Sequence, residues 1–158
     1  MSWASTTPKT QTLTDHLAVQ PQLQAKYQQF MATLWDAERV PTRLLELARL
    51  RIAAIHDCEE QWLQRHPDVR LKAHELAALQ QGRREGFDEL AQLVLEVAEL
   101  MPLNHHEISD AQVAALRHAL DEGGTVAVLT ALAFFDVNAR LSKTLGATAN
   151  PAEEAANV

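Results

Sequence analysis

Apolar residues recur every three or four positions over most of the chain, which is the spacing of residues on one face of an α-helix. Proline and glycine residues divide this pattern into seven predicted helices. They run from Pro21 to before Val40-Pro41, from Thr42 to about Ile55, from near Asp57 to before Pro67, from about Leu71 to Gln81, from Phe87 to Met101, from Ser109 to Leu120 and from Thr125 to Leu145. The predicted fold class is therefore all-α.

Several of the predicted helices have capping residues at their ends. Ser109 followed by Gln112 is a capping-box pattern, which begins a helix. The Gly123-Gly124 pair is expected to close that helix, and Gly146 is expected to cap the last one. The helix from Thr42 to Ile55 is apolar on most sides, so we expect it to lie at the centre of the molecule.

Length and composition favour one globular domain. The chain has 158 residues, of which 47% are hydrophobic, and this is enough to form a packed core. We expect residues 1–12 to be a disordered N-terminus and residues 147–158 to be a flexible tail. Residues 13–146 then form the domain.

Charge and hydropathy limit the partners that we expect. The formal net charge of −7 repels phosphate backbones, so we expect no nucleic-acid partner. No stretch reaches about 18 consecutive apolar residues, so we expect no membrane association. The N-terminus has no charged segment followed by an apolar run, so a secretory signal is not expected and we predict a cytoplasmic protein.

The sequence offers few metal ligands. Cys58 is the single cysteine, which excludes an internal disulfide and a cysteine-cluster zinc site. His105 and His106 are adjacent in a predicted loop, and no H-E-x-x-H pattern occurs. We therefore expect no bound metal and no cofactor. The Glu59-Glu60 pair is expected to be solvated.

The stretch from Leu44 to His66 carries the candidate chemistry. Glu46 stands 12 residues before Cys58, and the tract Leu50-Arg51-Ile52 lies between them. Together with the C-terminal helix through Phe134-Phe135-Asp136-Val137-Asn138-Ala139-Arg140-Leu141, this pattern resembles the alkylhydroperoxidase D-like / carboxymuconolactone decarboxylase family over about residues 20–146. The resemblance implies an all-α fold, a homo-oligomer and peroxide reduction by a peroxiredoxin-type antioxidant oxidoreductase.

The resemblance also assigns roles to residues. It makes Cys58 the reactive thiol and Glu46 its proton relay. The second cysteine of the family's Cys-x-x-Cys pair falls on Gln61, and the family histidine falls on Arg65, with His66 one residue later. A dithiol cycle is therefore impossible in one chain, and the implied activity is peroxide reduction by a single thiol with an external reductant.

Both of these residues have a structural alternative. A helix N-terminus favours a Cys58 thiolate, but the neighbouring carboxylates of Asp57, Glu59 and Glu60 raise the pKa of a thiol. Cys58 can therefore be an inert, partly buried thiol. Glu46 can form an ordinary salt bridge with Arg49, three residues further along the same helix.

Glu46 and Cys58 can meet only if the chain folds back between them. On one continuous helix they would lie about 18 Å apart along the axis. His56-Asp57 is the expected break, with Asp57 as the N-cap of the next helix. We therefore predict one pocket that contains Glu46, Cys58, Gln61 and Trp62, with His56, Arg65 and His66 as further pocket residues.

Two other classes of function remain open. A non-redox member, like the decarboxylases of the family, would act on or bind a small organic acid, and the candidate carboxylate ligands are Arg43, Arg49, Arg51 and His56. A non-catalytic member would bind a small ligand or serve assembly. The expected partners are thus a small-molecule substrate or peroxide and further copies of this chain, because the apolar stripes of the first and last helices are too wide for one core.

Overall fold

The computed structural model describes residues 11–35 and 38–150, and within them it contains seven α-helices, one short 3-10 helix and no strand. The predicted all-α fold of about seven helices is confirmed. The helices are α1 (Leu13–Leu17), α2 (Pro21–Leu34), α3 (Thr42–Ile55), α4 (Glu59–Leu63), α5 (Ala73–Gln81), α6 (Glu89–Leu100), the 3-10 helix η1 (His105–Glu107) and α7 (Asp110–Leu145).

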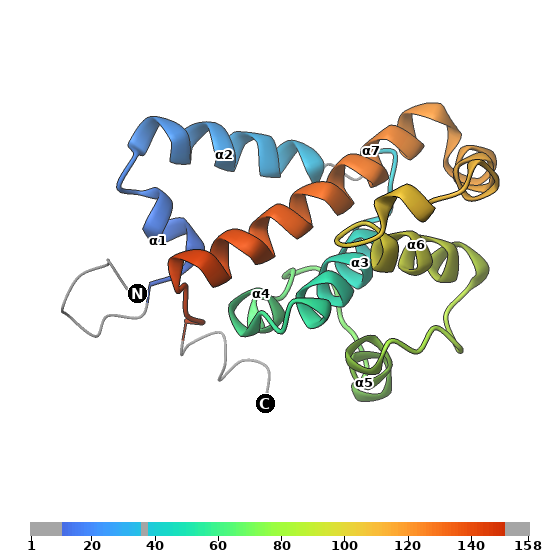
Figure 1. The fold of residues 1–158 in the computed structure, drawn as a ribbon, viewed down its shortest axis with the longest axis horizontal. Coiled ribbons are helices and arrows are strands. Elements are labelled where there is room, and N and C mark those ends of the chain that lie inside the picture. Colours follow the sequence, from blue (N-terminus) through green and yellow to red (C-terminus); the bar gives the residue numbers. More distant parts are fainter. Residues whose placement is uncertain (1–10, 36–37, 151–158) are drawn as a thin grey trace.

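Helix α3 lies at the centre of the molecule, as its sequence predicts. It packs against α4, α5, α6 and α7, and nine of its 14 residues are buried. Figure 1 shows α3 between α7 and α5, with α6 at one end. Because its buried residues include Glu46 and Arg49, this helix carries a charged pair into the core.

Helix α7 begins at the predicted capping box, in which Ser109 Oγ accepts from the Gln112 backbone N–H and the Gln112 side chain accepts from the Ser109 backbone. The helix is interrupted at Asp121, whose φ of 59° and ψ of −176° are not helical. The predicted closure at Gly123-Gly124 was thus wrong by two residues. The Asp121 carboxylate accepts a 2.8 Å hydrogen bond from the Gly124 N–H and so caps the second half of α7.

The two glycines after this kink allow the segment around Arg39 to approach α7 closely. A Cβ at Gly123 would lie 2.7 Å from Arg39 Nη1, and one at Gly124 would lie 2.9 Å from the Leu120 Cβ and 3.3 Å from the Arg39 carbonyl oxygen. The segment before α3 packs directly onto α7 here. These glycines therefore provide space for packing, whereas Asp121 makes the turn.

The connection between α3 and α4 positions Cys58. Asp57 has a left-handed φ of 49°, and the Cys58 N–H donates to the Ala53 carbonyl at 2.9 Å, which is the six-to-one bond of a Schellman C-cap. Cys58, and not Asp57 as predicted, is the N-cap of α4. An aspartate in the left-handed region ends α3, so its side chain is not available as the cap of α4.

The sequence pattern missed α1 and overextended the helix after Pro21. Helix α1 has only five residues, too few for a periodic stripe, and is held by a capping box between Thr12 and Asp15. Helix α2 ends at Leu34, well before Val40-Pro41, and Leu34 is the last residue of its apolar stripe. No residue of α2 is fully buried, and Figure 1 shows α2 lying along one side of α7.

The ends of the described chain lie close together. The Thr148 N–H donates to the Gln11 carbonyl at 2.9 Å, and the Gln11 N–H donates to Thr148 Oγ1 at 3.1 Å. The expected domain, residues 13–146, coincides with the first residue of α1 and the C-cap of α7 at Gly146. The expectations for residues 1–10 and 151–158 fall outside the described residues.

Helix α7 is the one described helix that is long and apolar enough to cross a membrane. Within its 18-residue apolar window, 44% of the residues are buried inside the molecule. Length and composition of this kind also occur in the core helix of a soluble protein, and α7 packs against α3 and α6.

Candidate functional site

The structure does not bring Glu46 and Cys58 into one pocket. Instead, the two residues line two separate cavities, which we name the Glu46 cavity and the Cys58 cavity. The Glu46 cavity has a volume of about 300 Å³, and the Cys58 cavity has a volume of about 640 Å³. The prediction of one shared pocket was therefore wrong.

The predicted pocket residues are divided between the two cavities. Gln61, Arg65 and His66 line the Glu46 cavity, whereas Trp62 lines the Cys58 cavity. His56 lines neither of them. The division follows from α4, because successive residues of a helix point in different directions, and Gln61 and Trp62 therefore face different cavities.

Glu46 forms a buried ion pair with Arg49. Its side chain is 1% exposed, and both of its oxygens accept from the guanidinium at 2.8 Å. The backbone N–H of His66 donates to the same carboxylate at 3.1 Å. This carboxylate is therefore fully hydrogen-bonded by fixed groups of the protein, which is the structural alternative that the sequence left open.

Arg49 also holds the end of α4 in place. Its guanidinium donates to the Gln61 carbonyl at 2.5 Å and to the Gln64 carbonyl. These two carbonyls lie at the C-terminal end of a short helix, where backbone acceptors have no intrahelical donor. The Glu46–Arg49 pair thus fixes the segment that carries Arg65 and His66 at the mouth of the cavity.

Arg65 is positioned differently from Arg49. Its guanidinium lies over the Trp62 ring at 4.7 Å from the ring centre. Its Nη1 atom is buried and has no hydrogen-bond partner among the described residues. Burial and, after it, the charge of Arg49 lower the pKa of Arg65, whereas the Glu46 carboxylate raises it.

The remaining wall of the Glu46 cavity comes from residues that the sequence analysis did not identify. Tyr27 of α2 donates a 2.9 Å hydrogen bond to Asn138 Oδ1 of α7, and Asn138 is 3% exposed. Trp35 packs against His66, with 4.7 Å between the ring centres. Met31 also lines the cavity. Asn138 stands between Asp136 and Arg140 in the sequence, so the pattern of α7 did not mark it as buried.

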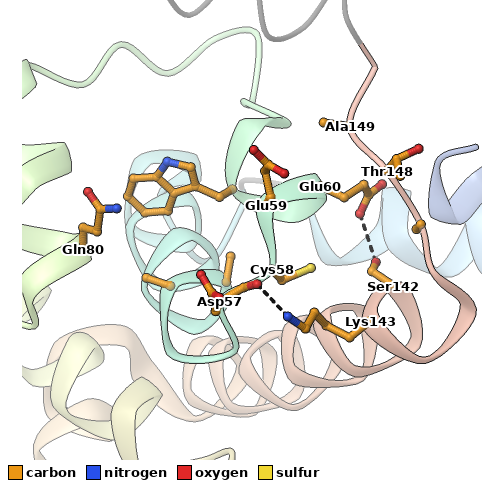
Figure 2. A pocket seen from close by; sticks show the side chains of 13 residues that line it. Asp57, Cys58, Glu59, Glu60, Gln80, Ser142, Lys143, Thr148 and Ala149 are labelled. Carbon is orange, nitrogen blue, oxygen red and sulfur yellow. Dashed lines mark hydrogen bonds between the residues drawn. The ribbon is translucent and has the colours of Figure 1, made fainter. Parts of the chain in front are cut away.

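The Cys58 cavity lies on the other side of α4. Figure 2 shows the Cys58 side chain directed towards the end of α7, where Ser142 and Lys143 lie. Burial raises the pKa of the Cys58 thiol and the Glu60 carboxylate adds to the rise, whereas the Gln61 N–H, Ser142 and Lys143 oppose it. Cys58 is only 2% exposed, so both its access and its ionisation are restricted.

Glu60 lines the Cys58 cavity, and its carboxylate contacts Gln61, which lines the Glu46 cavity. It is 3% exposed, so the expectation that it is solvated was wrong, whereas Glu59 is exposed as expected. Its carboxylate accepts from Ser142 Oγ at 2.9 Å, from Gln61 Nε2 at 2.5 Å and from the Leu13 N–H at 3.2 Å. The Leu13 contact comes from α1, the helix that the sequence pattern missed, so the burial of Glu60 could not be predicted.

The four candidate carboxylate ligands all have partners elsewhere. Besides Arg49, which pairs with Glu46, the partners are Glu75 for Arg43, Glu99 for Arg51 and Asp136 for His56. His56 Nε2 lies 2.6 Å from the Asp136 oxygen, at the junction of α3 and α7. These candidates therefore act in helix packing, and none of them points an unpaired charge into a cavity.

Within residues 11–35 and 38–150, no group of three or more His, Cys, Asp or Glu side chains is placed to hold a metal ion. His105 and His106 lie on η1 and are exposed. No protein-family model matches the chain, and no curated protein matches it.

Proposed function

We propose that this chain is a non-redox protein of the alkylhydroperoxidase D-like / carboxymuconolactone decarboxylase type, and that it binds a small organic molecule in the Glu46 cavity. The observation that carries the proposal is the composition of that cavity. Tyr27, Met31, Trp35 and Pro67 form the aromatic and apolar part of its wall, and polar side chains converge on it from α2, α3, α4 and α7. Its volume of about 300 Å³ is at the lower end of the range for ligand sites, so the ligand is small.

The state of the two residues expected to catalyse redox chemistry supports the non-redox choice. Cys58 is buried, its pKa is raised, and it lies in a different cavity from Glu46. Glu46 is paired with Arg49, so it is not poised as a proton relay for the thiol. A thiolate is the nucleophile in peroxide reduction, and each of these features disfavours it.

The test is ligand binding with a variant that blocks the cavity. Gln28 is an exposed residue of α2 at the cavity wall, and Gln28→Trp should fill the entrance without disturbing the core. Gln29→Trp is the matched control, because Gln29 is also exposed on α2 but does not line the cavity. We expect small aromatic molecules to shift the NMR signals of the Trp35 indole in the wild type and in Gln29→Trp, and to lose this effect in Gln28→Trp. Equal binding to both variants would contradict the proposal.

Peroxide reduction by Cys58 is the second candidate, and one observation favours it. Cys58 lines the larger cavity, and Ser142 and Lys143 beside it act to lower the pKa of its thiol. In this reaction the Cys58 thiolate would attack one peroxide oxygen, break the O–O bond and release the other oxygen as water or an alcohol. An external dithiol would then reduce the resulting sulfenic acid to the thiol, with release of water and oxidation of the dithiol to a disulfide.

Peroxide consumption with a dithiol reductant tests this candidate. Turnover that is abolished in Cys58→Ser and slowed in Glu46→Gln at neutral pH would support it. The same background rate in the wild type and in Cys58→Ser would exclude it and leave the non-redox proposal in first place.

A further inference from the structure

We propose that two segments of the chain form a latch on the Cys58 cavity, and that local opening of this latch, without unfolding of the central helices, controls access to the Cys58 thiol. The latch consists of residues 11–17, which include α1, and residues 147–149, which follow α7. Residues 147–149 line the Cys58 cavity, so they form part of the wall between its interior and solvent. The inference concerns this cavity alone and does not depend on a ligand in the Glu46 cavity.

Hydrogen bonds between the two segments hold the latch closed. The Thr148 N–H donates to the Gln11 carbonyl at 2.9 Å, and the Gln11 N–H donates to Thr148 Oγ1 at 3.1 Å. Two residues further along, the Leu13 N–H donates to the carboxylate of Glu60, which lines the same cavity. Figure 2 shows Thr148 and Ala149 where the chain leaves the end of α7. The start of α1 therefore ties the segment after α7 to the wall of the cavity.

The latch has far less buried surface than the rest of the cavity wall. Helix α1 has five residues, and Leu13 is its one buried residue. A helix of this length does not persist in water without its tertiary contacts. Helices α3 and α7, which also line the cavity, bury many more residues. Because segments with few buried apolar contacts open at the lowest free energy, the latch opens while α3 and α7 stay folded.

His16 gives an independent reason why α1 is held weakly. Its Nε2 atom is buried and has no hydrogen-bond partner among the described residues. A buried polar atom without a partner destabilises the closed form, because water would bind this atom once α1 moves away. His16 therefore reduces the free-energy difference between the closed and the open latch.

Opening changes both the access and the ionisation of Cys58. With the latch closed, Cys58 is 2% exposed. Burial is also the largest cause of the raised pKa of its thiol. An open latch reduces this burial, so it exposes the sulfur and at the same time favours the thiolate, which is the reactive form.

Alkylation by iodoacetamide tests the inference, because Cys58 is the single cysteine and the reagent is small and neutral. The Cys58 thiolate displaces iodide and forms a thioether, which mass spectrometry of the intact chain detects. Thr148→Ala removes one of the two bonds to Gln11 and Thr148→Pro removes both, so we expect alkylation about threefold and about tenfold faster than in the wild type. Thr144→Ala should leave the rate unchanged, because Thr144 is an exposed residue of α7 that lines neither cavity.

Low concentrations of urea separate opening of the latch from unfolding of the domain. Local opening exposes little surface, so the alkylation rate should change little with urea below the unfolding transition. A rate that rises with urea as steeply as global unfolding would overturn the inference. Equal rates in the wild type and the Thr148 variants, or a wild-type rate equal to that of a free thiol, would also overturn it. Should Thr148→Pro fail to fold, the comparison of Thr148→Ala with Thr144→Ala decides.

Discussion

Glu46 illustrates how a candidate catalytic residue can be a structural one. Its carboxylate and the guanidinium of Arg49 are both buried, with 1% and 7% of their side chains exposed. We predict that Glu46→Leu lowers the free energy of unfolding by about 3–5 kcal/mol, because it leaves the Arg49 charge buried without a partner. Urea denaturation of both proteins measures this loss.

A double variant provides the control for this prediction. Glu46→Leu combined with Arg49→Met removes both charges and keeps similar volumes, and it should recover part of the loss. The recovery is incomplete, because Arg49 also donates to the carbonyls of Gln61 and Gln64. A double variant no more stable than the single one would show that the charge of Arg49 is tolerated alone.

Tyr27 is expected to make the free energy of unfolding depend on pH in the alkaline range. Burial and, after it, the Glu60 charge raise the pKa of Tyr27 from 10.0 to about 12, against the opposing hydrogen bond to Asn138. Above the pKa of the unfolded chain, the folded state therefore holds the proton more tightly than the unfolded state, and stability falls as pH rises. From pH 10 to 12, we expect the wild type to lose up to about 2 kcal/mol through this group. Tyr27→Phe should show a shallower loss over the same range, and parallel curves would contradict the assignment.

Gly82 is required at the C-cap of α5 for two reasons. Its φ is 70°, and a Cβ there would lie 2.6 Å from Arg51 Nη2. The Arg51 guanidinium is held in place, because its Nε donates to Glu99 and its Nη1 donates to the Leu79 carbonyl. We predict that Gly82→Ala lowers the free energy of unfolding by about 1–3 kcal/mol. Gly86→Ala is the control, because Gly86 also has a positive φ, of 94°, but nothing lies within 4 Å of its Cβ position. A loss in Gly82→Ala no larger than in Gly86→Ala would show that the contact with Arg51 costs nothing.

At the scale of helices, the sequence correctly predicted the helices and helix ends that are determined by apolar periodicity and by local capping residues. The bounds of α3 and the two caps at Ser109 and Gly146 are confirmed. It did not predict α1, which is too short for a stripe, or the position of the break in α7. That break lies where the segment around Arg39, which is distant in the sequence, packs onto α7. Local sequence signals therefore predicted the long helices, but they did not predict the short helix α1 or the helix break that depend on tertiary packing.

Asp121 lets us test the break in α7 directly. Its side chain caps the second half of the helix through the Gly124 N–H. We predict that Asp121→Ala lowers the free energy of unfolding by about 1–2 kcal/mol. Asp121→Asn keeps the acceptor and should change it by less than about 0.5 kcal/mol. Chemical denaturation compares the two, and equal losses would mean that charge and not capping matters here.

At the scale of the whole molecule, the sequence identified the region of the candidate site, but it did not predict that this region contains two separate cavities. Glu46, Gln61, Arg65 and His66 do line one cavity, which the corner at the end of α3 makes possible. Cys58 was predicted to lie in the same pocket because the chain was expected to fold back at His56-Asp57, yet it lines the cavity on the other side of α4. Which side a residue of a short helix faces depends on its packing against α1 and α7, and no spacing in the sequence reports that.

Helix α2 carries the last prediction, which concerns assembly. It is a 14-residue helix without a single buried residue in the isolated chain, and Leu23 and Phe30 are 56% and 36% exposed. The Phe30 ring lies 4.4 Å from that of Phe134 on α7, and Val137, one turn further along α7, is 39% exposed. An apolar face that joins two helices in this way is typical of an interface between subunits. We therefore predict that a second copy of this chain covers it.

Light scattering at micromolar concentration should give a multiple of the 17.6 kDa chain mass. Val137→Glu places a charge on the shared face, away from the core, and should reduce the measured mass because burying an unpaired carboxylate at an interface is unfavourable. Leu103→Glu makes the same change at an apolar residue that is 67% exposed but lies near η1, so it should leave the mass unchanged. A wild-type mass of one chain would contradict assembly, and equal effects of the two variants would place the interface elsewhere. Because α2 also forms one wall of the Glu46 cavity, through Tyr27 and Gln28, its coverage by a second copy would hold that wall in place.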